Sequence, residues 1–184
     1  MIVQGKGMDI KSDQLTVRPF DEAVDSLDEL TELLHRAYKA LADMGLKYLA
    51  TYQDTETTRR RISNGTCFVA LYNEQIVGTI TFKMPHGGHD CHWLDRPDVG
   101  HISQMAVEPD WQGRGIGDRL MSQAEDFARQ QGLPELALDT SEKAVHLISW
   151  YERLGYRFID HVQWDVTNYR SVVMSKTLDG VGGS

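Results

Sequence analysis

The hydrophobic positions along this chain repeat with two periods, which divide it into helices and strands. Spacings of three and four predict helices at about 26–44, 55–63, 115–131 and 144–154. Short runs rich in β-branched and aromatic residues predict strands at 15–20, 66–72, 76–83, 100–107, 135–139, 156–164 and 170–178. Two helices show a stripe that should be buried, made of Leu27, Leu30, Leu34, Ala37 and Leu41 in the first, and Ile116, Leu120, Ala124, Phe127 and Ala128 in the second.

The order of these elements is β-α-α-β-β-β-α-β-α-β-β. It combines hairpins with one βαβ crossover, which predicts a mixed, mostly antiparallel sheet with helices on both faces. We expect one domain at 15–178, with an N-terminal extension at 1–14 and a flexible, glycine-rich tail at 179–184.

Composition narrows the class of protein. The 184 residues carry a formal net charge of −8, which disfavours a nucleic-acid partner. No apolar run approaches the roughly 20 residues of a membrane span, and the first residues lack a signal-peptide core. The two cysteines do not make a disulfide framework. We therefore expect a cytoplasmic protein.

The stretch between Gly100 and Gln131 is the most informative about function. A strand, a turn with a proline and three alternating glycines lead into an amphipathic helix. The first N–H groups of a helix have no intrahelical partner and the dipole there is positive, so this turn predicts an anion site, best suited to a phosphate. The pattern lacks the Gly-Lys-Ser/Thr of a Walker loop and the G-x-G-x-x-G of a dinucleotide fingerprint.

The same stretch resembles the Q/R-x-x-G-x-G/A signature of the GNAT (Gcn5-related) N-acetyltransferases, here Gln112, Gly115 and Gly117. The resemblance extends over about 15–178 and implies the GNAT acyl-CoA N-acyltransferase fold. It also implies acetyl-CoA as co-substrate and no metal. Strands four and five would splay apart to receive the pantetheine arm. The implied cofactor-binding residues are Met105, Ala106, Val107, Gln112, Gly113, Arg114, Gly115, Ile116 and Gly117.

A second block, "LISWYERLGYRF", resembles the family's helix that ends in Leu-Gly-aromatic. From the pattern alone, Tyr151 is more often an aromatic packing residue; the resemblance implies instead that it protonates the departing coenzyme A sulfur. His101 matches a position that often deprotonates the amine through water, and a histidine hydrogen-bonded at a strand start is the alternative. Strict alternation would place His101, Ser103, Met105 and Val107 on one face of their strand.

Three features fit the resemblance less directly. Many relatives carry Asn where this chain has Ala144, and Ser141, Glu142 and His146 are nearby substitutes. The segment Pro85–Pro97 contains His86, His89, Cys91 and His92, whose spacing matches no recognised zinc site. We expect it to border the acceptor site instead. Arg59, Arg60 and Arg61 are expected to form one solvated helical turn.

The function predicted is direct transfer of an acetyl group from acetyl-CoA to an amine, with His101 as base and Tyr151 as acid. The acceptor is an amine-bearing small molecule or a peptide amine, and the resemblance leaves a homodimer open. The alternative is a non-catalytic acyl-CoA-binding regulatory module.

Overall fold

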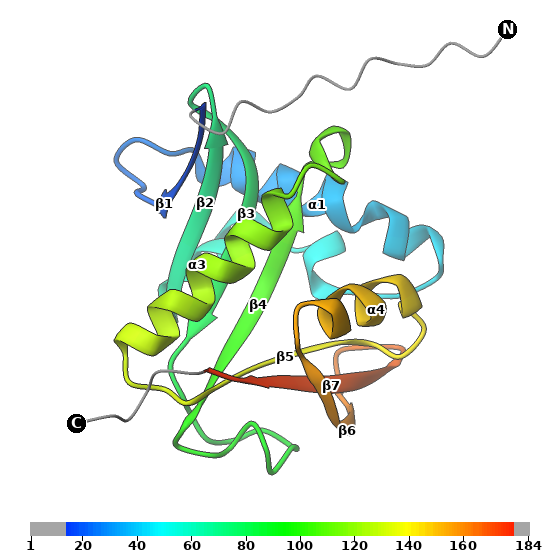
Figure 1. The fold of residues 1–184 in the computed structure, drawn as a ribbon. Helices are drawn as coiled ribbons and strands as arrows, with labels where there is room; N and C mark the ends of the chain where they lie inside the picture. Colours follow the sequence, from blue (N-terminus) through cyan, green and yellow to red (C-terminus); the bar gives the residue numbers. More distant parts are fainter. Residues whose placement is uncertain (1–13, 179–184) are drawn as a thin grey trace, which may run out of the picture.

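The computed structural model describes residues 14–178 and contains one seven-stranded sheet in the order β1-β2-β3-β4-β5-β7-β6 (Figure 1). All neighbouring strands are antiparallel except β4 and β5, which are parallel. The strands are β1 (Leu15–Pro19), β2 (Thr66–Tyr72), β3 (Gln75–Lys83), β4 (Val99–Val107), β5 (Glu135–Ser141), β6 (Arg157–Gln163) and β7 (Arg170–Thr177). The predicted element order and fold class are confirmed. Residues 1–13 of the predicted extension 1–14, and the predicted tail 179–184, lie outside the described residues.

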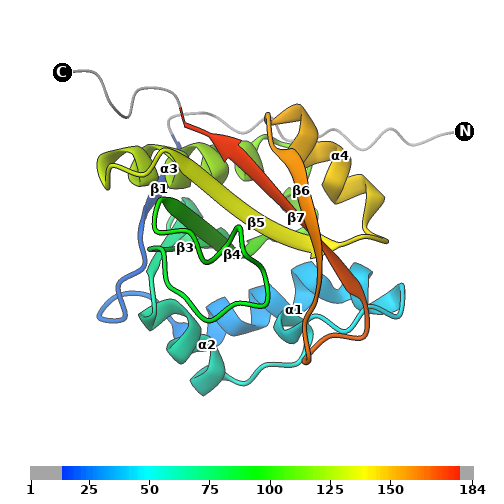
Figure 2. The same cartoon turned by 90° about the horizontal axis from the view of Figure 1, so that it is seen from below.

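Four α-helices cover the two faces of this sheet. They are α1 (Leu27–Asp43), α2 (Thr55–Ser63), α3 (Ile116–Gln130) and α4 (Val145–Arg153). Seen from below, α3 and α4 lie on one side of the sheet, and α1 and α2 lie on the other (Figure 2). Two short 3-10 helices, at Leu49–Thr51 and Pro109–Trp111, were not predicted. None of the helices between residues 14 and 178 has the length and apolarity needed to cross a bilayer.

Local signals in the sequence place the ends of these elements. The side chains of Ser26 and Asp54 accept hydrogen bonds from backbone N–H groups in the first turns of α1 and α2. Gly45, with φ of +80°, ends α1 in the left-handed conformation that favours glycine. Asn73 and Glu74 both have positive φ, as a tight two-residue hairpin between β2 and β3 requires.

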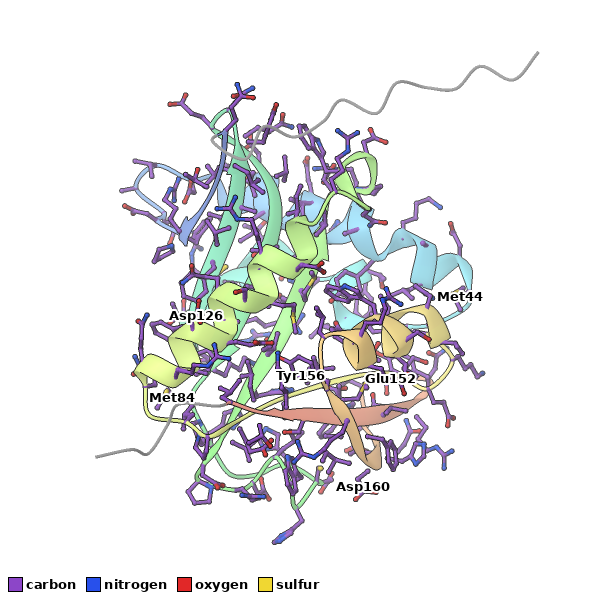
Figure 3. All side chains as sticks on the ribbon, viewed as in Figure 1. Met44, Met84, Asp126, Glu152, Tyr156 and Asp160 are labelled. Atoms are coloured by element: carbon purple, nitrogen blue, oxygen red, sulfur yellow. The ribbon has the colours of Figure 1, made fainter. Side chains whose placement is uncertain are left out.

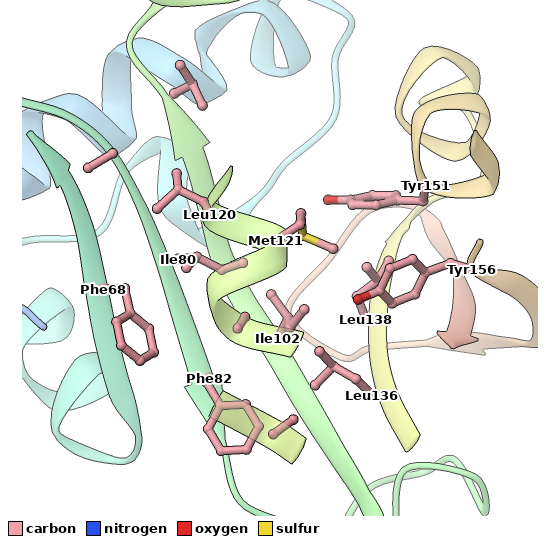
Figure 4. Packing of buried hydrophobic residues seen from close by; sticks show 14 of the residues in the cluster. Phe68, Ile80, Phe82, Ile102, Leu120, Met121, Leu136, Leu138, Tyr151 and Tyr156 are labelled. Carbon is pink, nitrogen blue, oxygen red and sulfur yellow. The ribbon is translucent and has the colours of Figure 1, made fainter. Parts of the chain in front are cut away.

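The main core lies between α3 and the sheet (Figure 4). Four residues of the predicted α3 stripe are at most 1% exposed, namely Ile116, Leu120, Ala124 and Ala128. Phe127 is only half-buried, with its ring edge-on to Phe68 and Phe82. Asp126, labelled on α3 in Figure 3, is exposed, whereas Tyr156 is buried. Burying a large apolar side chain contributes roughly 1.5–3 kcal/mol, so this stripe fixes α3 on the sheet.

A β-bulge in β4 corrects the predicted alternation. Thr79 pairs with Ala106 and Thr81 pairs with Ser103, so Ile80 alone faces two residues of β4. Gln104, at the bulge, has a φ of +51°.

The extra residue inverts the side-chain direction of the rest of the strand. Met105 and Val107 pack in the α3 core together with Ile102, whereas Ala106 packs with residues of α1. The prediction that His101 and Ser103 share a face with Met105 and Val107 is therefore wrong.

Candidate active site

The two parallel strands separate soon after they meet. Pairing between β4 and β5 is confined to three positions, from Val99–Glu135 to His101–Ala137. Beyond them, Met105–Val107 of β4 and Asp139–Thr140 of β5 line opposite parts of a cavity of about 660 Å³. The remaining walls come from α1, α4 and the glycine-rich loop. The splay that the family resemblance implied is thus confirmed.

The three glycines of the loop serve two different geometric needs. Gly113 and Gly115 have φ of +72° and +78°, and a Cβ on either would meet nothing within 4 Å. Backbone conformation therefore requires glycine at these positions, and the space beside them is open. Gly117 lies inside α3, where a Cβ would approach Met105 Cε and the Trp150 ring to 3.0 Å. Glycine here lets α3 lie close to β4 and α4.

The loop presents the N-terminus of α3 to the cavity. Gly115 is the N-cap and provides no side-chain cap, so the first N–H groups face the cavity edge without the usual side-chain oxygen. Gln112 Nε2 donates to Val107 O at 3.1 Å and so ties the loop to the end of β4. Arg114 donates to Asp110 O at 3.0 Å, with its guanidinium over the Trp111 ring. Ile116 lines the cavity from the buried side of α3.

Tyr151 lines the cavity from α4. Its side chain is buried, and Figure 4 shows its hydroxyl pointing away from α4 toward β4. Burial raises the pKa of this phenol far above its ordinary value, with smaller contributions from Tyr38 and Tyr48. No other group in residues 14–178 hydrogen-bonds its hydroxyl. Tyr151 therefore keeps its proton at neutral pH.

His101 lies on the other face of the sheet. Its Nε2 is 3.5 Å from Asp139 Oδ1, and no group among the described residues makes a hydrogen bond to it. His101 does not line the cavity, but its partner Asp139 does. Burial opposes ionisation of Asp139, yet the neighbouring His101 and Trp164 outweigh it and lower its pKa. Asp139 is therefore ionised beside the imidazole.

Sequence reasoning missed several residues that shape this site. Asp139 could have been noticed as the one carboxylate within the apolar run "LALD". The contact of Tyr38, whose hydroxyl donates to Met105 O at 3.0 Å, could not be foreseen because α1 and β4 are far apart in sequence. Trp150 donates to Asp118 Oδ1 at 2.9 Å and links α4 to the first turn of α3.

Ala144 and the segment 85–97 do not supply a clear ligand set at the cavity. Ala144 is fully buried before α4, and of its proposed substitutes only His146 lines the cavity. In the segment 85–97, Cys91 is buried and His89 lies 6.1 Å from His101, measured between ring centroids. Within residues 14–178, no group of three or more His, Cys, Asp or Glu is arranged to hold a metal.

The arginine run is a correction. Arg59 and Arg60 are exposed as expected, but Arg61 is half-buried and donates to Gln53. The prediction of one solvated turn is therefore wrong at Arg61.

Comparisons with known proteins agree with this geometry. Residues 27–156 match the acetyltransferase (GNAT) family. The S-(2-succino)cysteine N-acetyltransferase of Bacillus subtilis (strain 168) is 33% identical over 131 residues, covering 70% of this chain and 77% of that protein. The aminoalkylphosphonate N-acetyltransferase of Salmonella typhimurium is 34% identical over 89 residues; these cover 48% of this chain and 54% of that protein.

Solved structures show the same fold. The ribosomal-protein-S18-alanine N-acetyltransferase from Escherichia coli has a TM-score of 0.69 at 16% identity, with 92% of this chain and 97% of that chain covered. An acetyltransferase from Salmonella typhimurium, solved with acetyl-CoA, has a TM-score of 0.66 at 19% identity and the same coverage.

Proposed function

The chain belongs to the acetyltransferase (GNAT) family, and from this premise we propose how its residues carry out acetyl transfer. The protein is an acetyl-CoA-dependent N-acetyltransferase acting on an amine. The acceptors named for two relatives, S-(2-succino)cysteine and an aminoalkylphosphonate, favour a small-molecule amine over a peptide amine. A cytoplasmic location and a homodimer stay predictions.

The single observation that carries the proposed site is the splay of β4 and β5 beside the uncapped N-terminus of α3. The N–H groups at Gln112–Gly117 would hold the pyrophosphate of acetyl-CoA, because they combine a positive helix end with open space at two glycines. The backbone at Met105–Val107 lies on the cavity and is not paired with β5, so it would bind the pantetheine arm. One of its N–H groups would polarise the thioester carbonyl.

Tyr151 is the proposed general acid. When bound, acetyl-CoA supplies an activated acetyl group, whose carbon–sulfur bond breaks as the amine nitrogen bonds to the carbonyl carbon. A buried phenol that retains its proton can deliver it to the departing sulfur. Solvent then returns a proton to Tyr151.

His101 is the proposed base, acting from the opposite face of the sheet. Because it does not line the cavity, it would accept the proton of the amine through a water at the splay. Asp139, 3.5 Å away, would orient the imidazole and stabilise its charged form. Asp139 is thus a positioning residue in this proposal.

The test is release of free thiol from acetyl-CoA in the presence of a panel of amines, with two tyrosine variants compared. Tyr151→Phe should lower kcat and kcat/KM together, by about 10²–10⁴-fold, while the Kd of acetyl-CoA is nearly unchanged. Phe keeps the ring, so only the hydroxyl is tested.

Tyr156→Phe is the matched control. Tyr156 is also buried, but its hydroxyl donates to Glu125 of α3 at 3.2 Å, and Tyr156 does not line the cavity. This variant should lower the melting temperature and leave kcat unchanged. A Tyr151→Phe protein as fast as the parent would leave Tyr151 as a packing residue. Binding of acetyl-CoA without transfer to any amine would favour the regulatory module.

A further inference from the structure

The face of the sheet opposite α3 carries two cationic side chains that the proposed chemistry does not use. Arg61 projects from α2, and Lys83 ends β3 as the antiparallel neighbour of His101. Both are half-buried. Lys83 also lines a second hollow of about 570 Å³, together with Gly65 and His86. Two cations therefore lie on the same face of the sheet as His101.

A buried network holds the guanidinium of Arg61 in place. Arg61 Nη1 donates to Gln53 Oε1, and Gln53 is 2% exposed. Gln53 Nε2 in turn donates to Gln104 Oε1 at 2.9 Å and to Thr58 Oγ1 at 2.7 Å. Gln104 is the residue at the bulge of β4. The same irregularity that reshapes β4 thus orients Arg61.

One carboxylate, Asp139, interacts electrostatically with both cations. The strongest electrostatic neighbours of Arg61 are Tyr38, Asp139, Tyr169 and Tyr52, of which Asp139 is the only carboxylate. Lys83 interacts with the same carboxylate and is repelled by Arg61. Asp139 already faces His101 and accepts a hydrogen bond from Trp164 at 2.9 Å. Two cations therefore share one carboxylate that is already engaged.

The pKa values of both cations are lowered, which agrees with this shortage of negative charge. Burial lowers the pKa of Arg61, and burial followed by the charge of Arg61 lowers the pKa of Lys83. Neither side chain forms an ion pair within residues 14–178. A partly buried cation without an ion-pair partner is unfavourable, and a bound anion reduces that cost.

We propose that the acceptor amine carries an acidic group, a carboxylate or a phosphate-type anion, which binds to Arg61 and Lys83. This inference rests on the proposed function and specifies its substrate class. Tyr38 and Asp139, which interact electrostatically with Arg61, also line the cavity at the splay. An acceptor anchored by its acidic group would therefore direct its amine toward that cavity.

The geometry of the guanidinium suits this role. Its single hydrogen bond within the described chain leaves the other donors of the fork available, and a planar fork matches a carboxylate or phosphate in two parallel hydrogen bonds. The overall charge of −8 does not oppose the proposal, because recognition here depends on the local pair of cations.

The experiment compares paired amines that differ in one acidic group, with acetyl-CoA as donor. Suitable pairs are β-alanine with β-alaninamide, aspartate with asparagine, and 2-aminoethylphosphonate with ethanolamine. The parent should show a higher kcat/KM for the acidic member of each pair. Arg61→Gln should lower kcat/KM for the acidic amines, mainly through KM, by roughly tenfold to a hundredfold. Its kcat/KM for neutral amines and its Kd for acetyl-CoA should stay near those of the parent.

Two further variants keep the result interpretable. Arg60→Gln makes the same charge change on the exposed side of α2 and should behave like the parent. Lys83→Gln breaks no hydrogen bond among the described residues, so it tests the cation without the loss of the Gln53 contact. It should also weaken selectivity for acidic amines. Melting temperatures check that each variant is folded.

The outcomes separate the inference from the proposed function. Equal use of acidic and neutral amines, or equal behaviour of the Arg61 and Arg60 variants, would overturn the inference and leave the acetyltransferase mechanism intact. If no amine is acetylated, the proposed mechanism fails. Calorimetric binding of the same pairs in the presence of CoA then decides the inference. Tighter binding of the acidic members to the parent than to Arg61→Gln would support it, and equal binding would refute it.

Discussion

Replacing Gly115 by alanine tests the proposed phosphate site with a control that the chain itself provides. Gly115 and Gly132 have φ of +78° and +75°, and a Cβ on either meets nothing within 4 Å. Gly115 begins α3 at the cavity, whereas Gly132 follows α3 in the turn before β5. The two substitutions therefore impose the same backbone strain at opposite ends of one helix.

The expected magnitudes differ for stability and for binding. A left-handed conformation costs an L-residue roughly 1–2 kcal/mol. In a domain of this size, each kcal/mol of lost stability lowers the melting temperature by about 2–4 °C. Both variants should show this loss. Hydrogen bonds to a charged acceptor contribute about 1.5–3 kcal/mol each. If the new Cβ displaces the phosphate from one N–H group, the Kd for CoA should rise by roughly tenfold to 150-fold in Gly115→Ala alone.

Calorimetric titration with CoA, beside thermal melts of the same samples, measures both effects. Gly132→Ala should bind CoA like the parent despite its lower melting temperature. Equal CoA affinity in the two folded variants would show that the pyrophosphate does not lie against Gly115. Equal loss of affinity in both would show that strain in α3, and not a blocked site, weakens binding.

Two other predictions concern the opposite face of the sheet and the N-terminal region. His101→Ala should lower kcat by about 10²–10⁴-fold with little change in the Kd of acetyl-CoA, measured by thiol release from pH 6 to 9; full turnover across that range would make His101 structural. Asp25 accepts hydrogen bonds from both Nη atoms of Arg18 at 2.7 Å, which, despite burial, hold its pKa below the ordinary value. Its stabilisation is therefore present above the unfolded-state pKa and is lost as pH falls through the folded-state pKa. Because Arg18 is 38% exposed, Asp25→Asn should cost only about 1 kcal/mol in free energy of unfolding at pH 7, and urea melts should show this difference shrinking below about pH 4. A difference that does not vary with pH would contradict this account of the pair.

Much of the fold could be predicted because its signals are local. The bounds of α2 follow from the Asp54 cap and the Asn64-Gly65 stop, both written within a few residues. The glycine-rich loop is equally local, since its need for positive φ and for an uncapped helix start concerns only residues 112–117. Tyr151 could be placed at the cavity only with the family resemblance, because its pattern fits a packing residue as well.

The side-chain directions on β4 and the burial of Arg61 depended on contacts between segments that are distant in the sequence. Periodicity assumes an unbroken ladder, so the bulge at Gln104, created by pairing of β4 with β3, reversed the predicted faces of Met105 and Val107. Arg61 reads as a solvated residue in its own helix and becomes half-buried only because α2 packs beside α1 and the sheet.

By itself, the sequence determined the order of the elements, their approximate ends and the glycine-rich turn before α3, because backbone propensity, caps and glycine conformations act over a few residues. The tertiary structure alone decided which side chains share the site. His101 lies beside Asp139, and Gln53 links Arg61 to Gln104 at the bulge. The residues in these pairs are between 8 and 51 positions apart in the sequence. Such contacts arise from sheet register and helix packing, which no local pattern encodes.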